Sequence, residues 1–343
     1  MDGVAQSPVI PLASLAVGLI PVVLFLLALQ LMDSFKLVHG RDVLISILAG
    51  GTVALIAYPI NQWAEIGLHL EPALVRRYIA PLVEESLKAM FVIHLIRRER
   101  IGFMVDAGIH GFAVGTGFAL LENVYYAWKL STFSLAVWVV RGLGTAVLHG
   151  STTAVVAILA RDLTERHGST RLHWFLPGLA LAIGAHSLYN HLLLNPLLAT
   201  VMLLFAMPLL VIVVFSLSER ATRDWLGRGL DGDVERLEQL LNGEVLGSPV
   251  GEYMESIRHR FSGTVLADML CLLRIHLELS IRAKGVLIAR SVGVDLPPDP
   301  EVRSRLVEMD FLRRSIGPTG WLALNPLLRT SPRELWQINL LKA

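Results

Sequence analysis

The sequence is poor in charged residues for its length. Of its 343 residues, 17% are charged and 54% are hydrophobic, whereas soluble domains usually contain about 25% charged residues. The 30 basic and 29 acidic side chains nearly cancel, which argues against the basic surface of a nucleic-acid-binding domain. The mean hydropathy of +0.58 instead indicates a protein that places much of its length in a lipid bilayer.

Cysteine is almost absent as well. The single residue, Cys271, excludes an intrachain disulfide and leaves no thiolate cluster for zinc. Because Cys271 lies in an apolar stretch with helical spacing, we expect it to be a small buried residue. The sequence also contains no His-Glu-x-x-His motif, which excludes the usual zinc site of soluble metalloproteases.

Long apolar segments recur along the first two-thirds of the chain. A membrane-crossing helix needs about 20 predominantly apolar residues, and such segments lie near residues 9–31, 42–61, 73–96, 104–128, 133–160, 174–194 and 196–217. The first segment is too long for a signal peptide and has neither a basic start nor a small-residue cleavage site. We therefore predict that residues 1–218 form an all-α polytopic membrane helix bundle of about seven spans, with six or eight as alternatives.

Basic residues in the short loops predict the orientation of these spans. Loops rich in Lys or Arg tend to face the cytoplasm, and four such loops contain residues 36–41, 97–100, 161–171 and 220–228. All four fall on one side if the N-terminus is outside and the C-terminus is cytoplasmic. Arg76 and Arg77, between the second and third spans, are the exception. We expect a multi-pass protein of the cell membrane with this orientation.

The composition changes at about residue 219. Charges of both signs alternate there with leucines at helical spacing, and this pattern predicts helices over 252–290 and 299–315. Asp299-Pro300-Glu301 is typical of a capped helix start with proline at the first position. We predict that residues 219–343 form a cytoplasmic α-helical domain. A packed scaffold or dimerisation element is favoured over a ligand sensor, and the sequence does not predict the oligomeric state.

Four of the apolar segments carry ionisable or amide side chains. A charge at the centre of a membrane helix costs roughly 3 kcal/mol on insertion scales, so such groups are rarely idle. Residues four apart share a helix face, and alternating span directions bring the polar faces to a similar depth. Carboxylates, imidazoles and amides that converge in this way suit the activation of water and the binding of a metal or an oxyanion. The residues are Glu84, Glu85, Lys88, Glu122, Asn123, His149, His186 and Asn190.

Each of these residues also has a structural interpretation. Glu84 or Glu85 can form an ion pair with Lys88, and a lone buried histidine is more often a hydrogen-bonded core residue, as we expect for His94, His110 and His191. The joint occurrence favours a functional site. Two other classes of function remain open: a proton-coupled transporter, in which the same groups relay protons, and a non-catalytic membrane scaffold or immunity protein, in which they lock helix packing.

The order and spacing of the motifs resemble those of the PrsW-type intramembrane proteases. The motifs are Glu84-Glu85-x-x-Lys88, Phe118-x-x-x-Glu122-Asn123, His149 and His186-x-x-x-Asn190. These proteases share a superfamily with the type II CAAX prenyl proteases and with bacteriocin-processing or self-immunity proteins. Two features are those of the PrsW branch: Lys88, where the CAAX branch has an arginine one position later, and Glu122-Asn123, where it has a histidine. The resemblance covers residues 40–195.

The resemblance implies an intramembrane endopeptidase, of bacterial source, that cleaves a membrane protein substrate. In bacterial relatives the substrates include anti-sigma factors, which are cut to start a stress response. It implies that Glu84 is the general base with Glu85 as its partner, that Lys88 and Asn123 complete the catalytic motifs, and that Asn190 is an oxyanion donor. Glu122, His149 and His186 are then the metal ligands.

The metal implied by the resemblance is Zn²⁺. Catalytic zinc usually has three protein ligands and a water, a count that two histidines and one glutamate satisfy. A glutamic mechanism without metal is the alternative, because this family has been interpreted in both ways. We favour the metal, and the sequence does not decide which of Glu84 and Glu85 is the base.

Overall fold

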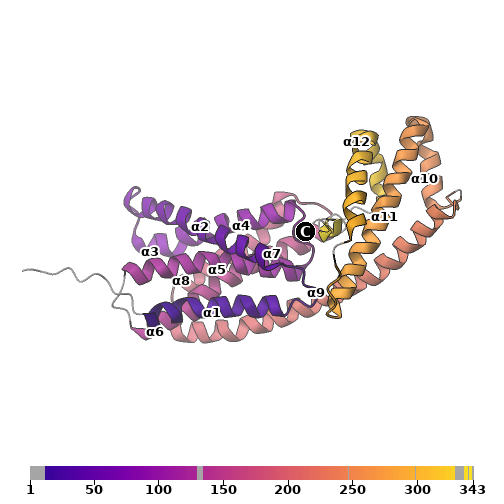
Figure 1. Cartoon of the computed structure of the whole chain (residues 1–343). Coiled ribbons are helices and arrows are strands. Elements are labelled where there is room, and N and C mark those ends of the chain that lie inside the picture. The colour runs from indigo at the N-terminus through magenta and orange to yellow at the C-terminus, as the bar shows by residue number, and fades with distance from the viewer. Residues whose placement is uncertain are drawn as a thin grey trace, which may run out of the picture. The chain divides into compact units, whose positions relative to one another are not determined.

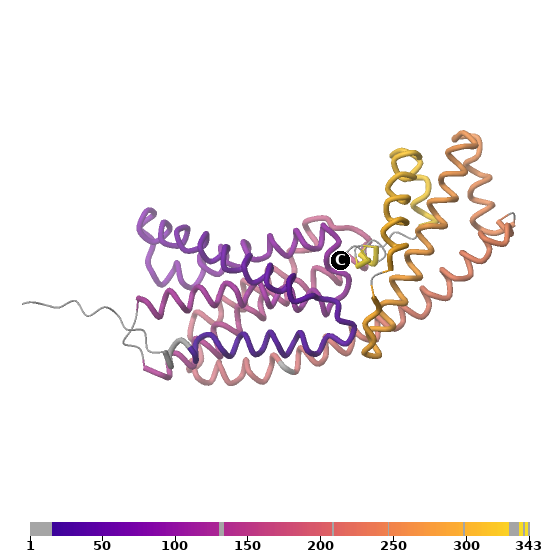
Figure 2. Tube along the Cα trace, in the orientation of Figure 1, coloured from indigo at the N-terminus to yellow at the C-terminus, as the bar shows by residue number. Residues whose placement is uncertain are grey.

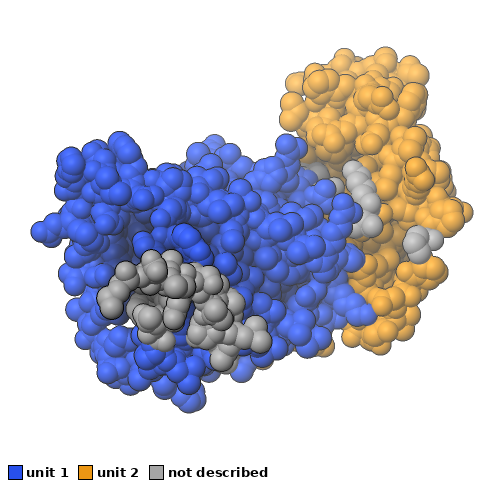
Figure 3. Space-filling view, turned by 60° about the vertical axis from the view of Figure 1, so that its left-hand side comes forward, with its two compact units in different colours: residues 1–218 blue, residues 219–343 orange. Residues whose placement is uncertain are grey.

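The computed structural model describes residues 12–129, 134–245, 247–297, 299–328, 336–338 and 340–341. Within these ranges all regular structure is helical, so the predicted all-α class is confirmed. The described chain divides into two compact units, residues 1–218 and residues 219–343 (Figure 3). The first three residues of the predicted span 9–31 lie outside the described ranges.

The helices of the first unit follow one another through short connections (Figure 1). Two π-helical turns, Val75–Ile79 and Val140–Thr145, join α3 to α4 and α6 to α7, and the 3₁₀ turn Leu172–Phe175 leads into α8. The helices are α1 (Leu12–Leu31), α2 (Gly40–Ile66), α3 (Pro72–Leu74), α4 (Ala80–Arg97), α5 (Met104–Lys129), α6 (Leu135–Val139), α7 (Ala146–Arg166), α8 (Leu176–Asn190) and α9 (Pro196–Leu241).

Several of these helices are long and apolar enough to cross a membrane. By length and composition, four helical stretches of the described chain qualify: Gly40–Ile66, Met104–Lys129, Leu135–Arg166 and Pro196–Leu241. The helices at the other three predicted spans are shorter or more charged: α1 has an apolar part of 16–31, α4 carries two glutamates and a lysine, and α8 has 15 residues. The count of about seven spans therefore stays a prediction.

Helix α5 lies at the centre of the first unit. In its most apolar stretch 83% is buried, against 6% for α9, and α5 packs against α2, α7 and α1. Glycines allow this close approach: a Cβ on Gly115 would lie 2.1 Å from the carbonyl oxygen of His149, and one on Gly117 would lie 1.9 Å from that of Ile47. The backbones of α2, α5 and α7 are thereby held in one register.

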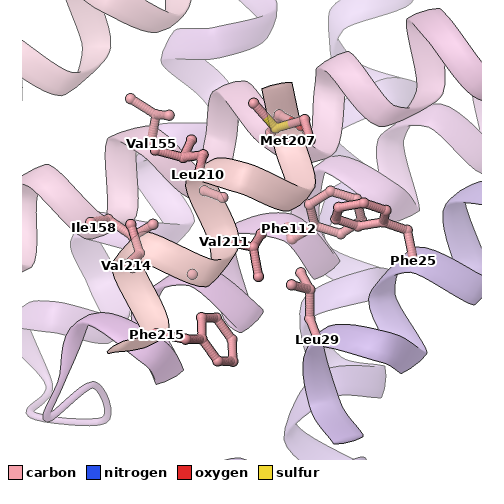
Figure 4. A pocket seen from close by; sticks show the side chains of 13 residues that line it. Phe25, Leu29, Phe112, Val155, Ile158, Met207, Leu210, Val211, Val214 and Phe215 are labelled. Carbon is pink, nitrogen blue, oxygen red and sulfur yellow. The ribbon is translucent and has the colours of Figure 1, made fainter. Parts of the chain in front are cut away.

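An apolar cavity of about 30 Å³ lies between α1, α5, α7 and α9 (Figure 4). The tube trace shows α1 and α9 next to each other along one edge of the bundle (Figure 2). Aliphatic and aromatic side chains line the cavity, among them Phe25, Phe112, Met207 and Phe215. Its only hydroxyl, on Ser151, donates to the carbonyl of Val147 at 2.6 Å. The lining therefore contains no group that could activate water.

The second unit consists of the last part of α9 with α10 (Pro249–Ile257), α11 (Gly263–Ser291) and α12 (Pro300–Leu328). The predicted span 196–217 is the first part of a longer helix, because α9 continues to Leu241. The predicted helix 252–290 is two helices, because Ser262 caps a new start by accepting from the N–H of Val265 at 3.4 Å. The start at Pro300 is confirmed, and Glu301 N–H donates to Asp299 at 2.9 Å.

The core of the second unit is built on one face of α11. Met269, Leu273 and Leu277 are buried there against residues of α10 and α12. Cys271 is exposed, contrary to expectation, because it lies two residues from both Met269 and Leu273, and two residues turn the side chain by about 200°, to the opposite face of the helix. Helix α12 is bent at Gly317, which has a φ of 67° directly before Pro318.

Candidate active site

The polar residues of four apolar helices meet inside the first unit. α4 supplies Glu84, Glu85 and Lys88, while α5, α7 and α8 supply one residue each to the same contacts. Glu85 and Lys88 are fully buried, and Glu84 is 8% exposed. Of the eight polar residues that the sequence analysis expected to converge, the structure brings six into contact with one another. We name these six the site cluster: Glu84, Glu85, Lys88, Glu122, His149 and His186.

Glu85 is the hub of the site cluster. Its Oε1 atom accepts a hydrogen bond from Lys88 Nζ at 2.6 Å and lies 2.8 Å from His186 Nδ1. An ionised carboxylate only accepts, so Nδ1 of His186 donates this hydrogen bond, and in a neutral imidazole Nε2 then carries the lone pair. That Nε2 lies 4.0 Å from Oε2 of Glu84. Glu85 thus orients the imidazole of His186 toward its neighbour Glu84.

His149 is oriented by a second carboxylate. Its Nε2 atom lies 3.1 Å from Oε2 of Glu122, and its Nδ1 lies 3.1 Å from Lys88 Nζ. The same reasoning places the proton on Nε2 and the lone pair on Nδ1. The ring packs against that of His186, with centroids 4.8 Å apart at 86°, and against Phe118. The two histidines therefore face each other with one lone pair each directed away from their carboxylate partners.

Glu84 completes a group of three possible metal ligands. One ligand atom each from Glu84, His149 and His186 lies within 4.8 Å of the others. Oε1 of Glu84 accepts a hydrogen bond of 3.0 Å from Asn61 Nδ2 on α2. The sequence had grouped Glu122 with the histidines, whereas the structure groups Glu84 with them and places Glu122 on the Nε2 side of His149.

Two further residues of the site were missed at the level of sequence. Asn61 lies near the end of an apolar segment that appeared free of functional groups, so no signal marked it. The Nη2 atom of Arg141 lies 3.3 Å from Oε2 of Glu122. Arg141 is a charged residue inside the apolar segment 133–160, so the criterion that identified the other site residues could have found it.

Asn123 and Asn190 lie outside the site cluster. Asn123 is buried and accepts from Nε of Arg141 at 3.0 Å while donating to the carbonyl of Gly18 at 2.8 Å. Asn190 donates to the carbonyl of Arg76 at 2.9 Å, at the π-helical turn before α4. The neighbouring Ser187 donates to the carbonyl of Arg77 at 2.6 Å. Asn190 thus ties the end of α8 to the start of α4.

The remaining membrane histidines have other partners. His110 Nδ1 lies 2.9 Å from the hydroxyl of Ser46, and His191 bonds the backbone of Ser187 and the hydroxyl of Tyr78. His94 stacks on Phe91 with ring centroids 6.5 Å apart. None of these contacts involves the site cluster, which agrees with the structural interpretation given to these three residues.

The formal net charge of the site is negative when all three carboxylates are ionised. Glu84, Glu85 and Glu122 offer three carboxylates, and Lys88 and Arg141 offer two cations. With both histidines neutral, ionised carboxylates exceed cations by one. In a medium of low dielectric an uncompensated charge is costly, so the site favours an additional proton or metal cation.

The donor chemistry fits a metal ion. Two imidazoles and a carboxylate are a common ligand set of catalytic zinc, and each imidazole here has a carboxylate partner on its other nitrogen, as metal-binding histidines usually do. Oε2 of Glu85 is also a buried oxygen without a hydrogen-bond partner. A metal at Nδ1 of His149 would compete with Lys88 for one lone pair.

A comparison with family models assigns the chain to a known family. The model described as PrsW family intramembrane metalloprotease matches residues 40–217, which is more than half of the chain and includes the whole site cluster. The chain belongs to the PrsW family. It is accordingly a membrane protein and an intramembrane metalloprotease. No curated protein and no solved structure matches the chain significantly.

The PrsW match has a clear relation to the helices. It begins at the first residue of α2 and ends one residue before the boundary of the first unit, so α1 and the second unit lie outside it. Both residues that the sequence missed, Asn61 and Arg141, lie inside it. The contact of Asn123 with Gly18 joins the matched region to α1.

Proposed function

We propose that this PrsW protein is a zinc-dependent endopeptidase that cleaves a membrane-associated protein substrate, in a regulatory step of the anti-sigma-factor type. The observation that carries the proposal is the buried group of Glu84, His149 and His186, with ligand atoms within 4.8 Å of one another. Three such donors belong to three helices far apart in sequence. Family membership identifies the class of reaction, and we propose that the reaction takes place at this group of residues.

Each residue of the site cluster has a separable role in this proposal. Glu84, His149 and His186 hold the zinc ion, which when bound polarises the scissile carbonyl and the attacking water. Glu85 accepts the proton of that water at Oε2, because its Oε1 is occupied by Lys88 and His186 while Oε2 has no partner. This division differs from the one implied by the resemblance, in which Glu84 is the base and Glu122 a ligand.

Burial gives the site a further property that supports hydrolysis. Lys88 and both histidines are at most 3% exposed, so bulk water is excluded and the electrostatic effect of each charge is strong. Lys88 holds Glu85 by an ammonium–carboxylate hydrogen bond. We propose that this bond keeps the base ionised and fixed in place until the substrate enters.

The arrangement of the chain in the membrane is part of the proposal. We propose that the N-terminus is outside, that the second unit is a cytoplasmic domain, and that it packs as a scaffold or dimerisation element. The basic loops and the mixed charges after residue 219 support this. Labelling of single cysteines introduced into the loops of a variant without Cys271 tests it.

The site is tested with four variants of the full chain, purified in detergent and mixed with a single-span substrate. Glu84→Gln and His186→Ala are expected to lose bound zinc and cleavage together. Glu85→Gln is expected to keep zinc near one per chain but to lose cleavage by about 10²-fold or more, as for loss of a general base. His110→Ala is the matched control, since this buried membrane histidine contacts Ser46 and not the site cluster.

The outcomes separate the mechanisms. Cleavage that survives complete removal of zinc would overturn the metal and favour a glutamic mechanism. Normal cleavage by Glu84→Gln or His186→Ala would remove the role given to that residue. Substrate uptake driven by a pH gradient, with no peptide cut, would instead support a transporter.

A further inference from the structure

Arg141 is a largely buried cation beside Glu122. Its side chain is 14% exposed, and its Nη2 atom lies 3.3 Å from Oε2 of Glu122, the same oxygen that His149 Nε2 contacts at 3.1 Å. A single carboxylate oxygen therefore joins the guanidinium to the imidazole. None of the four sequence motifs includes Arg141.

Two other contacts restrain the guanidinium directly. Its Nε donates to Oδ1 of Asn123 at 3.0 Å, and its plane lies 3.8 Å from the ring centroid of Tyr126. The amide of Asn123 is fixed in turn by its hydrogen bond to the carbonyl of Gly18. A planar, delocalised cation suits a site that combines an amide, a carboxylate and an aromatic face, and lysine does not.

The backbone at Arg141 is specialised as well. Arg141 lies in the π-helical turn Val140–Thr145, and such turns are frequent at functional sites. The next residue, Gly142, allows α1 to approach so closely that a Cβ there would lie 1.9 Å from the carbonyl oxygen of Val17. The backbone next to Arg141 is therefore held close to α1, while the guanidinium itself contacts side chains of α5.

We propose that Arg141 is a positioning residue for the reaction, which acts through Glu122 to hold the imidazole of His149 with its Nδ1 atom turned away from Glu122. A carboxylate that accepts from the distal N–H of a histidine ligand fixes the ring and its tautomer. Without the guanidinium, Glu122, whose side chain is 24% exposed, would keep only the imidazole beside it and would turn toward water. His149 would then lose its orientation. This role of Arg141 rests on the proposed function.

A double-mutant cycle tests this chain of contacts. Arg141→Met and Glu122→Gln are each expected to lower zinc affinity, measured by competition with a chelator, and kcat by about 10- to 100-fold, as for other residues behind a metal ligand. If Arg141 acts through Glu122, the double variant equals the worse single variant within about twofold. Arg141→Lys keeps the charge without the planar fork and is expected to retain more activity than Arg141→Met.

Arg161 provides the matched control. It is also a buried arginine, 2% exposed, with an ion pair to a glutamate, Glu165, at 2.7 Å. It lies twelve residues after His149 on α7, about 18 Å along the helix, and contacts the backbone of Gly102. Arg161→Met is expected to lower thermal stability but to leave the zinc affinity and kcat of the folded fraction unchanged.

The results distinguish the role of Arg141 from the proposed function. Losses that multiply in the double variant, or unchanged zinc affinity and kcat in Arg141→Met, would overturn the role of Arg141. Equal losses of zinc affinity in Arg141→Met and Arg161→Met would show a general effect of removing a buried arginine, and would also overturn it. Wild-type protein that neither binds zinc nor cleaves would contradict the proposed function itself.

Discussion

At the scale of residues, the site depends on which partner each polar atom has. Glu85 and Glu122 are each joined to one histidine and one cation, whereas Glu84 is joined to an amide and faces both histidines. The three carboxylates are chemically identical, so their roles differ only because their neighbours differ. The proposed roles of the three glutamates, as a ligand, a base and an orienting group, rest on these different neighbours.

Asn190 gives a residue-scale prediction. Its amide donates to the backbone of Arg76 and makes no contact with the site cluster, so Asn190→Ala is expected to reduce stability by about 1 kcal/mol, the usual value of one hydrogen bond. Cleavage at saturating substrate should fall by less than about 10-fold. Thermal unfolding and kcat measure the two effects.

An oxyanion donor would behave differently. Removal of such a donor typically costs about 10²–10³-fold in kcat, so a loss of that size in Asn190→Ala, with unchanged unfolding temperature, would restore the role implied by the family resemblance. His186→Ala, expected to abolish cleavage, sets the reference for loss of a site residue in the same helix.

At the scale of elements, close helix packing positions the site. The backbone of α7 at His149 lies directly against Gly115 of α5, where a Cβ would meet the carbonyl oxygen at 2.1 Å. The helix that carries Glu122 and the helix that carries His149 therefore touch within the site itself. The hydrogen bond between the side chains of Glu122 and His149 therefore requires a small residue at this helix contact.

Gly115→Ala is the element-scale prediction. The new methyl group must push α5 and α7 apart at His149, and overpacking of this kind costs about 1–3 kcal/mol. We expect a lower unfolding temperature in detergent and weaker zinc binding. The displaced contact is backbone and has no flexible end that could move aside.

Gly184→Ala is the control for that prediction. Gly184 lies on α8, two residues before His186, and a Cβ there has nothing within 4 Å. Since alanine is favoured over glycine in a helix by about 1 kcal/mol, this variant should be as stable as the wild type or slightly more stable. Equal effects of the two substitutions would contradict the packing argument.

At the scale of the whole molecule, two units with different cores form one chain. The first unit buries ionic groups among membrane helices, and the second has a core of leucine, isoleucine and methionine from α10, α11 and α12. A buried polar group also joins α9 to α11 in the second unit, where Lys284 and Ser280 both donate to Asp233. The second unit therefore has the features of an independently packed domain.

His276 makes the stability of the second unit depend on pH. Burial lowers the pKa of this histidine to about 4, Lys284 acts in the same direction and Asp233 opposes it. The unfolded chain takes up a proton below about pH 6.5 while the folded unit does not. The contribution of His276 to the stability of the second unit is therefore fully present above pH 6.5. It is lost as the pH falls toward 4, by about 1.4 kcal/mol per pH unit.

Hydrogen exchange measures this effect in the full chain. Peptides from α11 should exchange faster at pH 5 than at pH 7.5 once the intrinsic pH dependence is removed, and His276→Leu should abolish the difference. His259, an exposed histidine of the same unit, gives the control variant His259→Gln, which should behave like the wild type. A pH dependence that persists in His276→Leu would contradict the assignment.

The sequence by itself determined the helical class, the membrane character and six of the residues that meet in the site, because helix period, apolar length and charge in apolar segments are local properties of the chain. Only the tertiary structure decided which carboxylate joins the histidines, the contacts of Arg141, Asn61 and Asn190, the unbroken course of α9 and the exposure of Cys271. The physical reason is that these depend on how far each helix is rotated and shifted against its neighbours. That register is set by close backbone contacts, such as those at Gly115 and Gly117, and not by the spacing within any one helix.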